Sequence, residues 1–118
     1  MDSRRGSVQG DRRHARETGR ALRSTFNPEA RQELIEAATW YADKAGPWQA
    51  RDFRNEVDRA LRLLGEHPAM GTPDNHDTRS LVVHRYPYSV VYRLQADTLR
   101  ILAIASHSRR PGYWAGRR

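Results

Sequence analysis

The first half of the chain repeats its apolar residues at the spacing of an amphipathic helix. Within residues 27–46, the apolar positions that share one helix face are Leu34, Ala37, Ala38, Tyr41 and Ala45. Asn27 is a good N-cap residue, and Pro28 suits the first helical position, where no backbone donor is needed. Because Gly46 and Pro47 interrupt the pattern, we expect the helix to end there.

A second amphipathic helix is predicted directly after this break, within residues 48–68. Its apolar positions are Phe53, Val57, Ala60, Leu61 and Leu64. Gly65 and Pro68 mark its expected end. Because only a very short turn separates the two helices, they are expected to pack as an antiparallel hairpin.

The second half of the chain changes to the two-residue alternation of β-strands. Three strands are predicted, and they cover Arg79–Tyr86, Tyr88–Leu94 and Leu99–His107. Pro87 separates the first two, because proline cannot donate to a sheet ladder. Only the third strand is apolar on both faces, so we expect it to lie centrally in the sheet.

The remaining elements complete an α+β fold. Residues 21–26 alternate well enough to form an edge strand before the helices. Residues 69–77 are rich in turn formers and are expected as a loop, and a last short turn or helix should begin near Pro111. The predicted architecture is a small antiparallel sheet, made of an edge strand and a three-stranded meander. Two helices pack on one face of this sheet, and a short C-terminal cap closes it.

Length and charge divide the chain into an arm and one domain. A chain of 118 residues suits a single core. Residues 1–20 have many charges and no hydrophobic period, so they are predicted to form a disordered basic arm before a domain at 21–118. Such an arm either tethers the protein to nucleic acid or reflects a misassigned start codon.

Composition restricts the partners and the chemistry. The net charge of +7 comes almost entirely from arginine, which indicates an anionic partner or the codon usage of a GC-rich genome. The chain has no cysteine, so disulfides and thiolate metal sites are excluded. No apolar run is long enough to span a bilayer, so a cytoplasmic protein without a membrane partner is expected.

Four stretches in a fixed order carry a family resemblance. They are FNPEARQELIEAATWYAD, the spaced residues F…V…AL…L…HP of the second helix, RSLVVHRYPYSVVYRL and ILAIASHSRRPGYW. In this combination, residues 21–117 resemble the RelE/ParE superfamily of toxins from type II toxin–antitoxin systems, the plasmid stabilisation protein family. The resemblance implies the α+β fold described above, inhibition of bacterial growth, and a cognate antitoxin protein that wraps the toxin.

The superfamily contains two modes of toxicity. Some members cleave messenger RNA in the ribosomal A site without a metal, and others bind DNA gyrase and are not known as nucleases. We interpret the sequence first as a toxin that cleaves mRNA on the ribosome, a metal-independent endoribonuclease. The alternative is a non-enzymatic inhibitor of DNA gyrase. Neither interpretation requires a metal or a cofactor.

Three residues are candidates for RNA cleavage, namely Arg79, His107 and Arg110. Metal-free cleavage needs a base, an acid and cations that stabilise the phosphorane. Histidine is the side-chain type suited to general acid–base work at neutral pH, and His107 ends the last predicted strand, with Arg110 close behind it. Arg79 opens the first strand of the meander, and we expect all three to converge with Tyr88 on one concave face. As structural alternatives, Arg79 would cap the preceding loop or pair with Asp77, and His107 would hydrogen-bond across the strand end.

Three further residues, Tyr88, Arg109 and Trp114, are candidates for binding nucleic acid or a target protein. Aromatic rings stack on exposed bases, and arginine binds phosphates or an acidic patch of the antitoxin. The alternative for Trp114 is packing, because with Tyr113 it would dock the C-terminal segment onto the helices.

The resemblance is incomplete where ribosome-dependent members carry cations. Those members have lysines in the strand before the hairpin and an arginine after the hairpin tyrosine. The matching positions here are Ser80, Val82 and Ser89. Losing these cations weakens phosphate stabilisation, but other cleaving members use histidine and arginine, so both modes of toxicity stay open.

Overall fold

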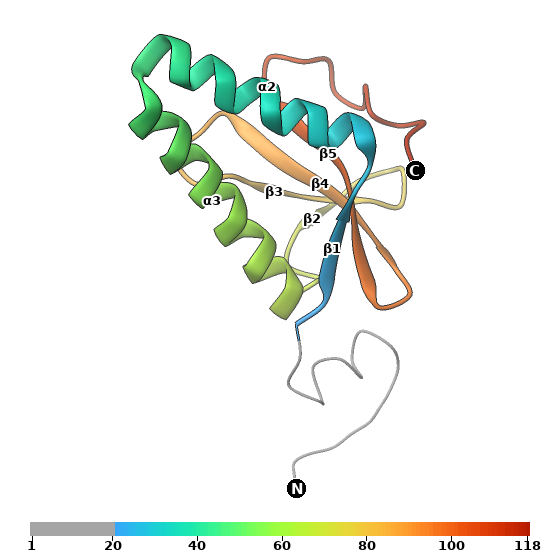
Figure 1. Ribbon diagram of the computed structural model, residues 1–118. Coiled ribbons are helices and arrows are strands. Elements are labelled where there is room, and N and C mark those ends of the chain that lie inside the picture. The colour runs from blue at the N-terminus through green and yellow to red at the C-terminus, as the bar shows by residue number, and fades with distance from the viewer. Residues whose placement is uncertain (1–20) are drawn as a thin grey trace, which may run out of the picture.

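In the computed structural model, residues 21–118 are described and form a five-stranded mixed sheet with two helices on one face (Figure 1). The elements are β1 (Arg23–Phe26), α2 (Pro28–Ala45), α3 (Pro47–Glu66), β2 (Thr72–Pro73), β3 (Arg79–Val82), β4 (Tyr88–Gln95) and β5 (Thr98–Ser106). The α+β class and the helical hairpin are as predicted. The predicted disordered arm, residues 1–20, lies outside the described residues.

The strand order is β1-β5-β4-β3-β2. β5 lies inside the sheet between β1 and β4, as its two-sided apolar sequence predicts, and β1 is an edge strand. The expectation of a wholly antiparallel sheet is wrong at this edge, because β1 pairs with β5 in parallel. Both helices intervene between β1 and the rest of the sheet, so no tight hairpin forces β1 to run antiparallel.

The β3–β4 connection is longer than predicted. β3 ends at Val82 rather than at Tyr86, and a turn fills the interval. In this turn the Val83 N–H donates to Tyr88 O, and the Tyr86 N–H donates to Val83 O. Arg85 adopts a φ of 71°, which no strand residue can hold. The backbone therefore leaves the β-ladder before Pro87. The sequence pattern of residues 83–86 predicts a strand that does not form.

The predicted loop before β3 contains the short strand β2. Thr72 pairs with Ser80 and Pro73 with Arg79 in the antiparallel direction. Two residues, one of them proline, are too few to show an alternating pattern. The sequence therefore does not reveal this edge strand.

Local chemistry explains the two helices. The Asn27 side chain accepts a hydrogen bond from the Glu29 N–H at 2.7 Å, which caps the start of α2. Gly46 has a φ of 94°, a conformation that glycine adopts without strain, and it both ends α2 and precedes α3. α3 ends at Glu66, between Gly65 and Pro68, the two residues that mark its predicted end.

Apolar residues pack on both faces of the sheet. On one face, Phe53 and Leu64 of α3 join Tyr92 of β4 in the main core, and all three are fully buried. On the helix-free face, a second cluster comprises Val91, Leu102, Ala103, Ala105 and Trp114. Leu102 has no partner in the β4–β5 register, so this bulge puts two consecutive residues of β5 on the same face.

The chain after β5 forms turns and covers the helix-free face. Trp114 is 6% exposed and packs in the second cluster, so the expectation that it docks onto the helices is wrong. β5 is apolar on both faces, and Trp114 shields the apolar residues on its helix-free face from water. Tyr113 does reach the helices, because its hydroxyl donates to Glu33 of α2 at 2.7 Å.

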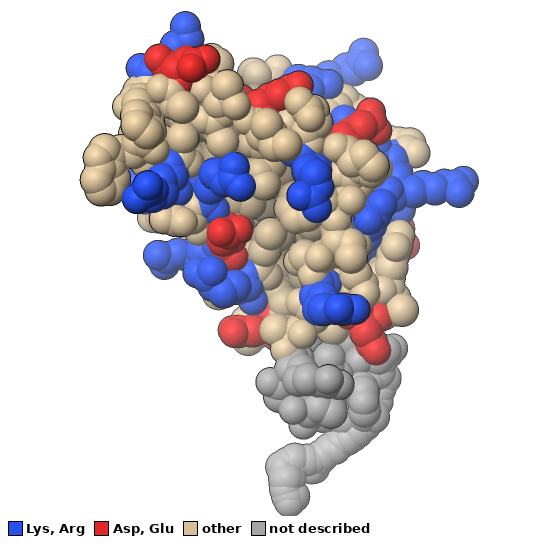
Figure 2. Space-filling view, viewed as in Figure 1, with Lys and Arg blue, Asp and Glu red and all other residues tan. Residues whose placement is uncertain are grey.

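The face that carries α3 and β1 has a mixed surface. Basic side chains are spread across the middle of it, with acidic side chains scattered above and below them (Figure 2). Both helices are amphipathic, and none within residues 21–118 combines the length and the apolar character needed to cross a membrane. α2 and α3 together contain six basic and eight acidic residues, so the net positive charge of the chain does not come from the helices.

Candidate target-binding site

A groove of about 510 Å³ lies between α2 and the chain that follows β5. Four aromatic side chains line it: Trp40 and Tyr41 of α2, Tyr88 of β4, and Tyr113. Trp40 remains 53% exposed, although it is large and apolar. Exposed aromatic residues in a concave surface are characteristic of sites that bind another molecule.

Tyr88 and Arg109, two of the predicted binding residues, both line this groove. The Tyr88 ring packs against the main core, where its centroid lies 5.1 Å from that of the Phe53 ring. The Arg109 guanidinium lies 3.8 Å above the Tyr113 ring and 4.0 Å from Glu33 Oε2. This cation–π contact holds a positive charge at the rim of the groove.

His107 and Arg110 lie at the same end of the sheet but do not line the groove. The His107 Nε2 atom is 2.9 Å from Ser89 Oγ, and the His107 N–H donates to Pro87 O. This is the hydrogen bond across the strand end that the structural alternative predicts. Arg110 is exposed and forms no ion pair within residues 21–118.

Arg79 is held at a second hollow, of about 350 Å³, beside the α3–β2 loop. Its Nη1 atom donates to the carbonyl oxygens of Gly71 at 2.8 Å and Ala69 at 3.1 Å. Arg79 therefore caps the preceding loop, as one structural alternative predicts. These bonds direct the guanidinium toward the loop backbone.

The expected convergence of Arg79 with His107 is wrong. In the β3–β4 ladder Arg79 pairs with Tyr92, while His107 contacts Ser89, which pairs with Val82. Tyr92 and Ser89 are three residues apart, which is roughly 10 Å along a strand. They also point to opposite faces of β4, because an odd separation reverses the side-chain direction. Sequence reasoning places both residues on the sheet but cannot give the register.

The positions where the resemblance expects cations do come together. Val82 pairs with Ser89, and Ser80 pairs with Val91, which belongs to the cluster on the helix-free face. These three positions therefore share that face with the side chain of His107, and all three are neutral. Within the described part of the chain, no three acidic or histidine side chains gather into a group that could hold a metal ion.

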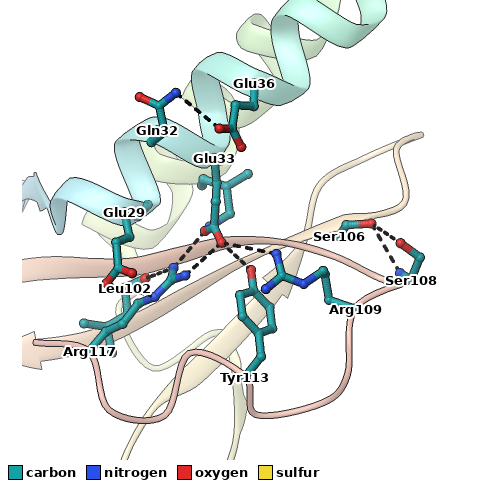
Figure 3. A network of polar contacts seen from close by, with 12 residues as sticks. Glu29, Gln32, Glu33, Glu36, Leu102, Ser106, Ser108, Arg109, Tyr113 and Arg117 are labelled. Atoms are coloured by element: carbon teal, nitrogen blue, oxygen red, sulfur yellow. Dashed lines mark hydrogen bonds and ion pairs between the residues drawn. The ribbon is translucent and has the colours of Figure 1, made fainter.

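Glu33 is the centre of a polar network that the sequence analysis does not identify (Figure 3). Its Oε1 accepts bonds from the Ile104 N–H at 3.0 Å and Arg117 Nη1 at 2.9 Å. Its Oε2 accepts bonds from the Tyr113 hydroxyl and from Arg117 Nη2 at 3.0 Å. Glu33 lies three residues after Ala30 and four before Ala37, both of which are buried. A charged residue on the buried side of a helix is the feature of the sequence that points to this network.

A second network ties the β3–β4 turn to α3. Arg85 Nη2 donates to Asp52 Oδ2 at 2.8 Å and to Glu56 Oε2 at 3.0 Å. The Tyr86 hydroxyl also donates to Asp52. The hydrogen bonds from Tyr86, which has the larger effect, and from Arg85 lower the pKa of the Asp52 carboxyl. Side chains of the turn that leads to Pro87 and the groove are therefore bonded to α3, and these bonds hold the turn in place.

Alkaline pH is expected to destabilise the fold through its tyrosines. Burial raises the pKa of all five, namely Tyr41, Tyr86, Tyr88, Tyr92 and Tyr113. For Tyr113 the shift is large, because burial acts together with the hydrogen bond to Glu33. Below pH 10, the ordinary tyrosine value, this contribution to stability is complete. Above pH 10 the tyrosines of the unfolded chain lose their protons at a lower pH than those of the folded chain. The free energy of unfolding therefore falls as the pH rises.

This pH dependence can be measured by denaturant unfolding across the alkaline range, with tyrosinate absorbance as a second signal. Tyr113→Phe should make the loss of stability shallower, because it removes the most strongly shifted group. A free energy of unfolding that stays constant through the alkaline range would contradict the prediction.

Comparison with known proteins agrees with the sequence resemblance. Residues 25–111 match the family described as ParE toxin of type II toxin-antitoxin system, parDE. A solved structure from the chromosomal ParDE TA system from P. aeruginosa is similar with a TM-score of 0.66 and 20% sequence identity, over 73% of this chain and 96% of that chain. No curated protein sequence matches. The family match extends over most of the chain, and the chain therefore belongs to the ParE toxin family of type II toxin–antitoxin systems.

Proposed function

We propose that this protein inhibits bacterial growth by binding DNA gyrase rather than by cleaving mRNA. The neutral side chains of Ser80, Val82 and Ser89, at the positions where cleaving relatives carry cations, are the observation that carries the proposal. Cleavage without a metal needs cations around the phosphate, and the His107 ring bonds only to Ser89 within the described chain. Arg79, the cation expected to complete the site, is bound to the loop beside α3. The geometry thus favours the second of the two interpretations of the sequence.

The aromatic groove is the surface we assign to the target protein. Tryptophan, tyrosine and arginine dominate the energetics of protein interfaces, and Trp40, Tyr88 and Arg109 are all present here. The exposed Arg110 extends the positive charge beyond the rim. A protein partner with an apolar segment beside acidic groups fits this surface, and no acid or base is required.

A cognate antitoxin is the second partner under this proposal. Membership of a toxin–antitoxin family supports a protein that neutralises the toxin, and the similar solved structure comes from a ParDE pair. An antitoxin that covers the aromatic groove would exclude the target from it. Target and antitoxin should therefore compete for the same surface.

Trp40→Ala is expected to relieve growth inhibition on controlled induction in a bacterial host. An aromatic anchor of an interface contributes about 2 kcal/mol or more, so binding to the target should weaken by more than about tenfold. Trp48→Ala is the matched control, because Trp48 is 79% exposed and lies outside the groove. Equal toxicity of both variants would overturn the assignment of the groove.

Metabolic labelling of the induced cells distinguishes DNA gyrase from the ribosome as the target. Thymidine incorporation should fall before methionine incorporation, and His107→Ala should leave this response unchanged. If methionine incorporation falls first and His107→Ala abolishes toxicity, the protein is a ribonuclease, and the proposal is wrong.

A further inference from the structure

The helix-free face has a polar region at the end where β4 turns into β5. Two cross-strand rows of the ladder define it. One row joins Arg23, Thr98 and Gln95, and the next joins Thr25, Arg100 and Arg93. Paired residues share a face, and residues two apart on a strand do so as well, so all six point away from the helices. We call these six residues the arginine face.

Two positive charges of the arginine face lie directly opposite each other. Arg93 of β4 pairs with Arg100 of β5, and like charges at such positions destabilise a sheet. Neither guanidinium forms an ion pair with an aspartate or a glutamate within residues 21–118. Asp74 and Asp77 line the same hollow as Arg93 but remain beyond ion-pair distance. The fold therefore keeps a repulsive pair that its own acidic residues do not neutralise.

Both guanidiniums also retain most of their hydrogen-bonding capacity. Arg93 gives one bond, to His76 O at 3.2 Å. Arg100 gives two, both at 3.3 Å, to Thr25 Oγ1 and Arg118 O. These bonds are long and none of them goes to an aspartate or glutamate side chain, whereas a guanidinium carries several more donors in a fork that suits phosphate. An anion with several oxygens would satisfy the donors that remain.

We propose that the arginine face binds the phosphodiester backbone of a nucleic acid. Every residue in it is arginine, threonine or glutamine, and these side chain types are among those that contact nucleic-acid phosphates. The face has no aromatic or apolar anchor, which the centre of a protein interface requires. It lies on the opposite side of the sheet from the main core, and the proposal does not depend on whether gyrase or the ribosome is the target.

The double variant Arg93→Gln with Arg100→Gln tests the proposal in the full-length chain. Its affinity for a short DNA or RNA duplex at low salt should fall by at least about tenfold, and the slope of log affinity against log salt should decrease by about 2. Its melting temperature should stay the same or rise, because the repulsive pair is gone. The control is Arg54→Gln with Arg62→Gln, which removes the same charge from exposed positions of α3 and should retain near-normal binding.

Two results would overturn the proposal. One is an equal loss of affinity in the two double variants, which would show attraction by net charge alone. The other is displacement of the duplex by poly-glutamate of matched charge as effectively as by unlabelled duplex, which would assign the face to an acidic protein. Comparison of DNA and RNA duplexes then identifies the source of the phosphate.

Discussion

Replacing Glu33 by alanine is expected to lower the free energy of unfolding by about 3–5 kcal/mol. The side chains of Glu33 and Arg117 are only 13% and 12% exposed, and they form two parallel hydrogen bonds. The alanine variant leaves the Arg117 charge without its main partner in a partly dry site. It also removes the acceptor of the Tyr113 hydroxyl and of the Ile104 N–H.

The last of these contacts explains why the loss should be large. β1 pairs with β5 only as far as Ile101, so the next part of β5 has a strand neighbour on its β4 side but none on its β1 side. Glu33 accepts the Ile104 N–H, and Arg117 donates to Leu102 O at 3.0 Å. Two side chains thus satisfy backbone groups that another strand would otherwise bond. Without them, buried polar groups lose their partners.

The control is Glu36→Ala, one turn further along α2. Glu36 is exposed and only accepts a bond from Gln32 at 3.3 Å, so its loss should cost less than about 0.5 kcal/mol. Denaturant unfolding measures both variants. Arg117→Ala combined with Glu33→Ala should cost less than the sum of the two single changes, because each single change leaves a charge unpaired. Strict additivity would contradict the coupling described here.

The sequence predicts those parts of the fold that depend on local chemistry. Asn27 and Gly46 mark the ends of α2, and hydrophobic periodicity assigns the faces of both helices. The parallel pairing of β1 and the turn at Arg85 depend on contacts between distant segments, so periodicity cannot reveal them. The arrangement of strands is therefore less predictable than their existence.

The candidate site shows the same contrast between features set by local sequence and features set by tertiary contacts. Residue type and position mark Tyr88 and Arg109 as candidates, and the fold brings both to one groove. Arg79 is a candidate as well, but the strand register separates it from His107 and places it on the opposite face of the sheet. The groove needs α2 as its second wall, and Trp40 is not among the apolar positions that share the predicted core-facing side of this helix. Tertiary packing alone creates that concavity.

Gly71→Ala is expected to destabilise the fold by about 2–3 kcal/mol, through overpacking of a site that has no room. A Cβ atom at Gly71 would lie 2.6 Å from Tyr92 Oη, 2.8 Å from Tyr92 Cε1 and 3.0 Å from Ser80 O. The Tyr92 ring cannot move aside, because it is 1% exposed and its hydroxyl both donates to Pro68 O and accepts the Gly71 N–H. The clash would therefore break these bonds or displace β2.

Gly116→Ala is the matched control for this change. A Cβ atom at Gly116 meets nothing within 4 Å, so the free energy of unfolding should change by less than about 0.5 kcal/mol. The comparison separates loss of space from the general effect of replacing glycine, which alone tends to stabilise. Because the α3–β2 loop also holds Arg79, Gly71→Ala should increase hydrogen exchange of the loop amides. A variant with normal stability and normal exchange would show that the loop and Tyr92 pack less tightly than these distances require.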